Sequence, residues 1–207
     1  MGFDKLRENG ELAILRPASA WLLPIVFSVI SLGIAAAGDA GRALLRYDRT
    51  AIADGEVWRL ASGHFAHLGT SHLLLNLAGL CLVWALVGRR MRLGHWLMIS
   101  MVTIACISLG FWFLDAQLEW YVGLSGVLHG LLLGGAVAGL RKARGESLAI
   151  FVVVIVKLAW EQLLGPLPGS EASSGGNVVV NAHLYGAIAG AICAIFLWRS
   201  VGRAAPI

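Results

Sequence analysis

The chain has 207 residues, of which 58% are hydrophobic and only 14% are charged. This balance excludes an ordinary soluble domain of this length and is typical of one bundle of membrane helices. The net charge of +4 does not indicate a nucleic-acid partner, because the basic residues flank apolar segments, as they do in membrane proteins.

The N-terminal part predicts a cytoplasmic leader over residues 1–17, followed by a first apolar span over about 18–37. About 20 apolar residues are enough to cross a bilayer. The triplet Ala35-Ala36-Ala37 resembles a signal-peptidase site, so the sequence leaves cleavage open. We favour a retained helix, because the segment is long for a signal sequence and contains Trp21 and Pro24.

A long polar loop over about 38–63 follows, and its length predicts that it has its own structure or a function. Five more apolar segments come after it, with a Pro- and Gly-rich loop before the last of them; they are expected at about 67–88, 93–114, 125–140, 148–164 and 178–198. The predicted domain is therefore 18–198, with a short cytoplasmic tail over 199–207.

The positive charges predict the orientation. They gather between the second and third segments, between the fourth and fifth, and after the sixth: Arg89, Arg90, Arg92, Arg141, Lys142, Arg144, Arg199 and Arg203. With six spans these clusters and the N-terminal one share a side, which the positive-inside rule makes cytoplasmic. The fold class predicted is an all-α membrane protein of six transmembrane helices, with a long first extracytoplasmic loop and both termini cytoplasmic.

A serine between two glycines, Gly123-Leu124-Ser125-Gly126, opens the fourth apolar segment. A helix N-terminus offers unpaired N–H groups and partial positive charge to a developing oxyanion. The glycines would let a substrate backbone come close. The same residues could serve only helix packing, because Gly and Ser are common where membrane helices touch.

The position of two histidines favours the catalytic interpretation. In a six-span topology Ser125, His72 of the second segment and His183 of the sixth all lie near the outer face. Polar residues within membrane spans are costly and usually functional. Asn76 is four residues after His72 and shares its helix face.

Glycines at intervals of four predict that the fourth and sixth helices approach closely. They are Gly126, Gly130 and Gly134 on one helix, and Gly186 and Gly190 on the other. Small residues at this spacing allow two backbones to touch, which would bring Ser125 and His183 within hydrogen-bond distance.

The chemistry that these side chains could perform is acyl transfer. His183 could remove the proton of Ser125, while the Ser125 N–H, His72 and the Asn76 amide could stabilise the oxyanion. No Asp or Glu is close to them in sequence, so the prediction is a dyad whose base is oriented by packing.

Other classes of function have weaker support. A transporter or channel would carry charges deep in several spans, whereas only Lys157 and Glu161 do so, four apart and able to satisfy each other. A metal site is not expected from His64, His67 and His72, because spacings of three and five do not share one helix face. Three isolated cysteines, without a CxxC pair, suggest neither a disulfide frame nor a zinc site, and no cofactor is expected.

Taken together, the motifs resemble the rhomboid intramembrane serine proteases, in the order in which that family carries them. They are Trp58-Arg59, His67, His72, Asn76, Gly123-Leu124-Ser125-Gly126, Ala182-His183-Leu184-Tyr185-Gly186 and Gly190. The resemblance implies that Ser125 is the nucleophile and His183 the base. It implies an oxyanion hole that includes His72 and Asn76, and structural roles for Trp58, Arg59 and His67.

One position departs from the common pattern. Many rhomboids have a tyrosine four residues after the serine, stacked on the catalytic histidine, and here it is His129. This motif is similar to the rhombosortase branch. That resemblance implies a bacterial inner-membrane protein whose partners are the bilayer and single-span substrates with C-terminal Gly-Gly sorting tails. His129 could also contact Ser125, but we favour a stacking or hydrogen-bonding role. The alternative function is a non-catalytic rhomboid-like protein that binds and escorts membrane helices.

Overall fold

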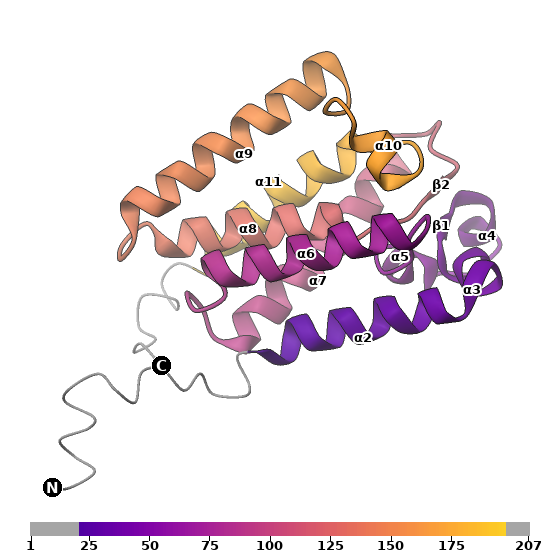
Figure 1. Ribbon diagram of the computed structural model, residues 1–207, viewed down its shortest axis with the longest axis horizontal. Coiled ribbons are helices and arrows are strands. Elements are labelled where there is room, and N and C mark those ends of the chain that lie inside the picture. Colours follow the sequence, from indigo (N-terminus) through magenta and orange to yellow (C-terminus); the bar gives the residue numbers. More distant parts are fainter. Residues whose placement is uncertain (1–20, 198–207) are drawn as a thin grey trace, which may run out of the picture.

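The computed structural model describes residues 21–197. The predicted leader, the tail and the outermost ends of the first and sixth spans lie outside the described residues. The elements, in chain order, are α2 (Leu22–Ala36), α3 (Gly38–Leu45), β1 (Tyr47–Asp48), α4 (Arg49–Ala53), α5 (Arg59–Ser62), α6 (Thr70–Val87), α7 (Leu93–Phe113), β2 (Trp120–Tyr121), α8 (Ser125–Gly139), α9 (Arg144–Leu164), α10 (Ser170–Ser174) and α11 (Val180–Phe196) (Figure 1).

The helical elements agree with an all-α membrane bundle. Among the described residues α6, α7 and α9 are long and apolar enough to cross a membrane, and α2 with α3 forms a pair bent by 119° that passes the same test. Helices α8 and α11 are apolar but shorter, with 15 and 17 residues. The count of six spans and the side on which the termini lie stay predictions.

Two helix boundaries differ from the expected ones. Helix α6 begins at Thr70 after the extended Gly69 (φ −174°), so His67 lies in the preceding loop and not in the span. Helix α9 begins at Arg144, four residues before the expected start at Leu148. Its polar first turn is stabilised by Glu146, which pairs with Arg90 at 3.0 Å and suits the positive end of a helix.

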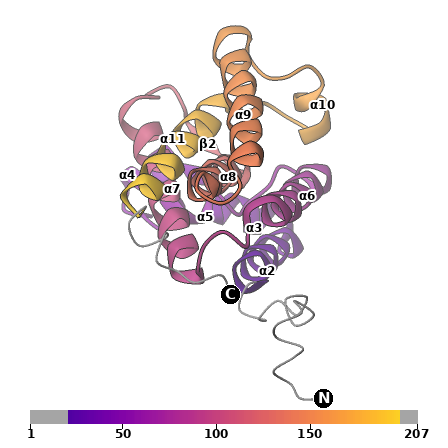
Figure 2. The ribbon, with the colours of Figure 1, turned by 90° about the vertical axis from the view of Figure 1, so that its left-hand side faces the viewer.

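Helix α8 forms the centre of the bundle, with α6, α7, α9 and α11 around it (Figure 2). Of its 15 residues, 11 are buried. The last apolar helix, α11, packs most closely against it, as the glycine spacing predicted.

The contact between α8 and α11 is backbone against backbone. A Cβ added at Gly126 would lie 2.7 Å from the carbonyl oxygen of Ala182, and one at Gly130 would lie 2.8 Å from that of Gly186. A Cβ added at Gly190 would overlap the carbonyl of Gly130. We call this glycine-lined contact the α8–α11 seam. It leaves no room for side chains, so the relative position of the two helices is fixed.

The first loop has its own structure, as its length predicted. The Arg59 guanidinium is buried and donates to the carbonyl oxygens of Ala43 and Arg46, at 2.8 and 3.0 Å, and to Glu56 at 2.6 Å. These bonds join α3, the turn before β1 and α5 into one unit. Buried polar groups need such partners, and a guanidinium with five donors can hold several segments at once.

This unit is attached to the segment that leads into α8. Strands β1 and β2 pair antiparallel, with Tyr47 opposite Tyr121. Arg49 donates to the carbonyl oxygens of Phe111 and Trp112 at the end of α7, and to those of Asp115 and Leu118 in the segment that follows it. The first loop thereby fixes the entry to the helix that begins with Ser125.

Candidate active site

The turn before Ser125 is held from both sides. The Tyr121 hydroxyl donates to the carbonyl oxygen of Gly123 at 2.6 Å. Gly123 has φ +131°, a conformation that side-chain-bearing residues rarely adopt, and a Cβ there would lie 2.9 Å from the His72 ring. Ser125 then begins α8, so its backbone N–H is one of the unpaired donors of a helix N-terminus.

The structure brings Ser125 and His183 together. The Ser125 Oγ lies 2.9 Å from the His183 Nε2, across 58 residues of sequence. Ser125 begins α8 and His183 lies in the first turn of α11, so both side chains stand at the same end of the α8–α11 seam, which sets their separation. The distance is within the range in which a histidine can accept the proton of a serine hydroxyl.

A carboxylate completes the arrangement, contrary to the expectation that packing alone orients the histidine. Glu161 of α9 is 2% exposed, and its Oε2 lies 2.9 Å from the His183 Nδ1. Its Oε1 accepts from the Lys157 ammonium at 2.7 Å. The expected Lys157–Glu161 pair does form, but it also reaches the histidine.

His129 stacks on His183. The two rings are 4.4 Å apart at an angle of 22°, and the His129 Nδ1 lies 2.7 Å from the carbonyl oxygen of Ser125, one turn back in α8. The side chain that could have competed for the serine hydroxyl contacts the His183 ring and the Ser125 carbonyl oxygen instead. Its ring restrains the His183 ring by stacking.

His72 and Asn76 border the same cavity as Ser125. The Leu68 N–H donates to the His72 Nδ1 at 3.3 Å, which leaves Nε2 to carry the ring proton. That proton is directed toward the turn at Gly123, next to the serine. The Asn76 amide donates one proton to the His72 carbonyl at 3.0 Å and has a second N–H left.

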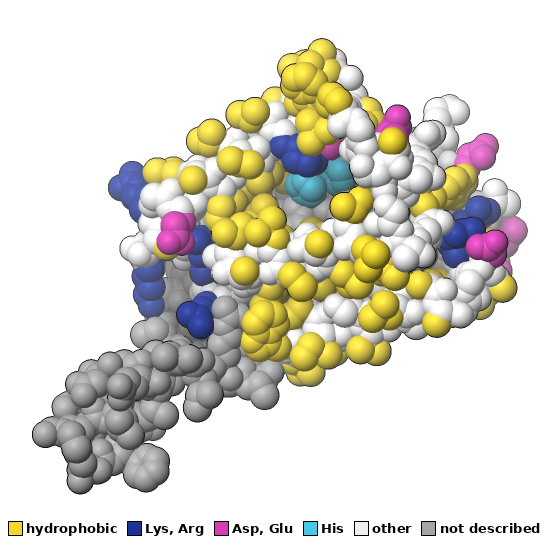
Figure 3. All heavy atoms as spheres, viewed as in Figure 1, with side chains coloured by type: hydrophobic (Ala, Val, Ile, Leu, Met, Phe, Trp, Pro, Cys, Tyr) yellow, Lys and Arg dark blue, Asp and Glu magenta, His cyan; other side chains and the backbone are white. Residues whose placement is uncertain are grey.

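The cavity has a volume of about 350 Å³. Helices α6, α8, α9 and α10 and the start of α11 line it, with Leu75 and Leu128 as apolar lining and Lys157 and Glu161 opposite. Histidine side chains are visible in a hollow of the surface beside α9, with a basic side chain next to them (Figure 3). The site is thus open to a ligand between α6 and α9.

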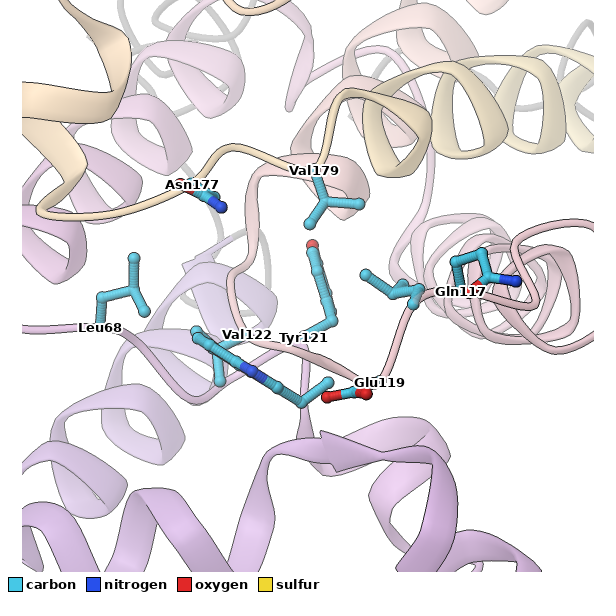
Figure 4. Close-up of a pocket in the computed structure, with 9 residues that line it drawn as sticks. Leu68, Gln117, Glu119, Tyr121, Val122, Asn177 and Val179 are labelled. Carbon is cyan, nitrogen blue, oxygen red and sulfur yellow. The ribbon is translucent and has the colours of Figure 1, made fainter.

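A second cavity of about 250 Å³ adjoins the first. Four residues line both: Tyr121, Val122, Asn177 and Val179 (Figure 4). The segment that leads into α8 therefore separates two hollows at the same end of the molecule, and both stand next to the Ser125 turn.

The remaining predicted residues have positions suited to support. Arg59 holds the segments of the first loop together by hydrogen bonds. Trp58 precedes it with a half-exposed side chain. His67 is buried, with its ring 5.0 Å from that of His72 and nearly perpendicular to it. Gly126, Gly186 and Gly190 form the α8–α11 seam.

Within residues 21–197, no group of three or more His, Cys, Asp or Glu side chains is arranged so that it could hold a metal ion. His64 and His67 both lie in the loop before α6. Burial lowers the pKa of each to about 4, so both rings are neutral at pH 7. His64 instead contacts the Ser108 hydroxyl at 3.1 Å.

A family model of the rhomboid domain matches residues 54–200. The chain belongs to the rhomboid family. No curated protein matches the chain in sequence. The match includes every rhomboid motif residue named above, from Trp58 to Gly190, and family membership indicates an integral, multi-pass intramembrane serine protease.

Two residues of this rhomboid site were missed by sequence reasoning. Tyr121 gave no signal, because its role depends on a turn that only the fold reveals. Glu161 did give one: it lies three residues before the end of α9, and His183 lies in the first turn of α11. In the predicted topology both positions are at the outer face, so their depths agree.

Proposed function

We propose that this rhomboid is an active intramembrane serine endopeptidase in which Ser125 is the nucleophile and His183 the base. The observation that carries the proposal is the 2.9 Å contact between the Ser125 Oγ and the His183 Nε2, at the floor of an open cavity. A serine paired with a histidine at this distance is the usual arrangement of an activated nucleophile.

The reaction follows from this pairing. The Ser125 oxygen attacks the scissile carbonyl carbon while its proton moves to the His183 Nε2. The oxyanion is stabilised by the Ser125 N–H, the His72 Nε2–H and the free N–H of Asn76. His183 then gives its proton to the leaving amine, and water, activated by the same nitrogen, hydrolyses the acyl-enzyme.

The site is expected inside the bilayer, near its outer face. Helix α8 has 15 residues and is therefore ~22 Å long, shorter than the ~30 Å hydrocarbon core. Its start, at Ser125, then lies below the membrane surface. A substrate helix would unwind at its outer end and enter between α6 and α9, because an extended backbone is tolerated there only inside a cavity.

For the substrate, we propose single-span proteins of the bacterial inner membrane with C-terminal Gly-Gly sorting tails. The similarity of Gly123-Leu124-Ser125-Gly126-Val127-Leu128-His129-Gly130 to the rhombosortase branch supports this substrate class. His129, the residue that differs from the common rhomboid pattern, stacks on His183, and this contact gives it a role in that motif. Glycines beside the scissile bond would ease unwinding, because they hold a helix poorly.

The function is tested by labelling the detergent-solubilised protein with a fluorophosphonate, which reacts with activated serines. We expect labelling of the wild type and none of Ser125→Ala or His183→Ala. His129→Ala and His129→Tyr should retain part of the reactivity, because His129 only restrains the base. Labelling that survives in His183→Ala but disappears in His129→Ala would reverse the assignment of the base.

Absence of labelling in wild-type protein that unfolds with a cooperative thermal transition would favour the non-catalytic, helix-escorting alternative. The substrate proposal has its own test. A Leu run placed across the cleavage site of a Gly-Gly substrate should slow cleavage, since leucine stabilises the helix. An unchanged cleavage rate would contradict the unwinding step.

A further inference from the structure

Glu161 is a carboxylate buried within an apolar helix bundle. It is 2% exposed, and removing an isolated carboxylate from water is costly unless partners compensate. Both of its oxygens have one: Oε1 accepts from Lys157 at 2.7 Å, and Oε2 lies 2.9 Å from the His183 Nδ1. The Lys157 partner keeps the carboxylate ionised, and an ionised carboxylate only accepts hydrogen bonds.

This fixes which nitrogen of His183 carries the proton. Because the Glu161 Oε2 can only accept, the proton of the neutral ring must be on Nδ1. The Nε2 lone pair is then free to accept the Ser125 hydroxyl proton at 2.9 Å. The opposite tautomer would place two lone pairs against each other at Glu161 and a donor against the serine hydroxyl.

Lys157 does not replace Glu161 as the partner of the ring. Its ammonium is 3.3 Å from the His183 Nδ1, farther than the carboxylate. It would need that nitrogen to be unprotonated, and this would direct a proton at the serine. The carboxylate is closer to Nδ1 than the ammonium is, and Ser125 needs an unprotonated Nε2; both favour Glu161 as the partner of Nδ1. Lys157 therefore binds the carboxylate, and the carboxylate binds the ring.

We propose that Glu161 is a positioning residue that extends the site to a Ser125–His183–Glu161 triad, with Lys157 holding the carboxylate. This inference rests on the proposed function. In the reaction the serine proton moves to Nε2 and the ring becomes an imidazolium. Glu161 stays ionised and stabilises it through Nδ1–H, as the carboxylate of a serine-protease triad does. When Nε2 releases its proton to the leaving amine, the ring returns to the same tautomer.

The test compares fluorophosphonate labelling rates of solubilised variants. The informative variant is the double change Lys157→Met/Glu161→Met. It removes both charges together, whereas either single change would leave the other charge without its partner. Replacing a buried ion pair by apolar residues of similar size is often neutral for folding. The matched control is Glu146→Gln, which changes a carboxylate on the same helix that is bound to Arg90, at the opposite end from His183.

We expect the double variant to label at least about tenfold and up to about 10⁴-fold more slowly than the wild type, the range set by losing a triad carboxylate. Glu146→Gln should label at the wild-type rate. If the double variant also labels at the wild-type rate, Glu161 serves only to neutralise Lys157, and the triad is wrong while the proposed function stands. If the wild type itself does not label, the proposed function falls and the triad with it.

A spectroscopic measurement separates positioning from general stability. In Ser125→Ala protein with ¹⁵N-labelled histidine, we expect a downfield Nδ1–H proton resonance that disappears in Ser125→Ala/His183→Ala. It should also disappear when Lys157→Met/Glu161→Met is added, while the thermal unfolding midpoint stays close to that of the parent. A resonance unchanged by loss of Glu161 would overturn the inference.

Discussion

The two helices that face the candidate site from opposite sides are built differently. Helix α8 has 11 of its 15 residues buried and meets α11 through glycines. Helix α9 has only 5 of its 21 residues buried, and its other apolar side chains, such as Val153 and Leu163, are exposed. The α8–α11 seam sets atomic distances, whereas the α9 side leaves space for a ligand.

The difference teaches how one small bundle meets two opposing needs. A proton transfer requires the serine and histidine to stay within hydrogen-bond distance, and the α8–α11 seam supplies that constraint. The proposed substrate helix would require an opening, and the sparse packing of α9 would supply it. Glu161 is the exception on the open side, since it joins α9 to His183, a residue of α11 at the end of the α8–α11 seam.

The largest effect is expected from filling the α8–α11 seam. Gly190→Leu would place a side chain where even a Cβ overlaps the Gly130 carbonyl. Backbone cannot move aside as a flexible side chain can, so we expect loss of labelling and a clearly lower thermal unfolding midpoint. Overpacking usually costs ~1–3 kcal/mol or more. The control is Gly33→Leu in α2, where a Cβ meets open space; an equal loss there would mean that the seam is not special.

The next largest effect is expected from acid, through the buried His67 in the loop before α6. Burial lowers the pKa of His67 to about 4, against about 6.5 in an unfolded chain. Between these values the unfolded state binds a proton that the folded state does not, so stability falls as the pH drops from about 6.5 and the loss is complete near pH 4. Its full size is ~3 kcal/mol.

The measurement is the thermal unfolding midpoint across this pH range. His67→Phe should reduce the acid-induced decrease, because phenylalanine keeps a ring of similar size in this buried position and has no group that takes up a proton. A pH profile identical to that of the wild type would assign the acid sensitivity elsewhere, with His64, of equally lowered pKa, as the next candidate.

The smallest effect on stability is expected on the open side. Leu75 is 51% exposed and lines the cavity from α6. Leu75→Ala should change stability by less than ~0.5 kcal/mol and leave fluorophosphonate labelling unchanged, while altering cleavage of a membrane-spanning substrate. Leu82→Ala, at an exposed position farther along the same helix, should do neither. Equal cleavage by both variants would argue against entry between α6 and α9.

The sequence was sufficient for the parts of the molecule that repeat a simple rule. Apolar length predicted the helices, and glycines four apart predicted the close contact of α8 and α11. Ser125 and His183 could be singled out because their depths follow from counting spans. These inferences need only periodicity and the order of elements.

What the sequence did not disclose depends on three-dimensional contacts. The start of α6 at Thr70 follows from a loop conformation at Gly69, which hydropathy does not report. Glu161 was interpreted as a partner for Lys157 alone, because spacing within a helix reveals neighbours on that helix and not across the bundle. A carboxylate has two oxygens, and the second one was free to meet His183.

The order in which the chain is made gives the seam a further consequence. His183 lies on α11, and its bond to Ser125 spans 58 residues of sequence. A chain that has been synthesised only as far as α9 contains the proposed nucleophile and carboxylate but no base. Proteolysis would then begin only once the last apolar helix has been inserted. If the proposed function holds, the membrane insertion machinery and its other clients would not meet an active but incomplete protease.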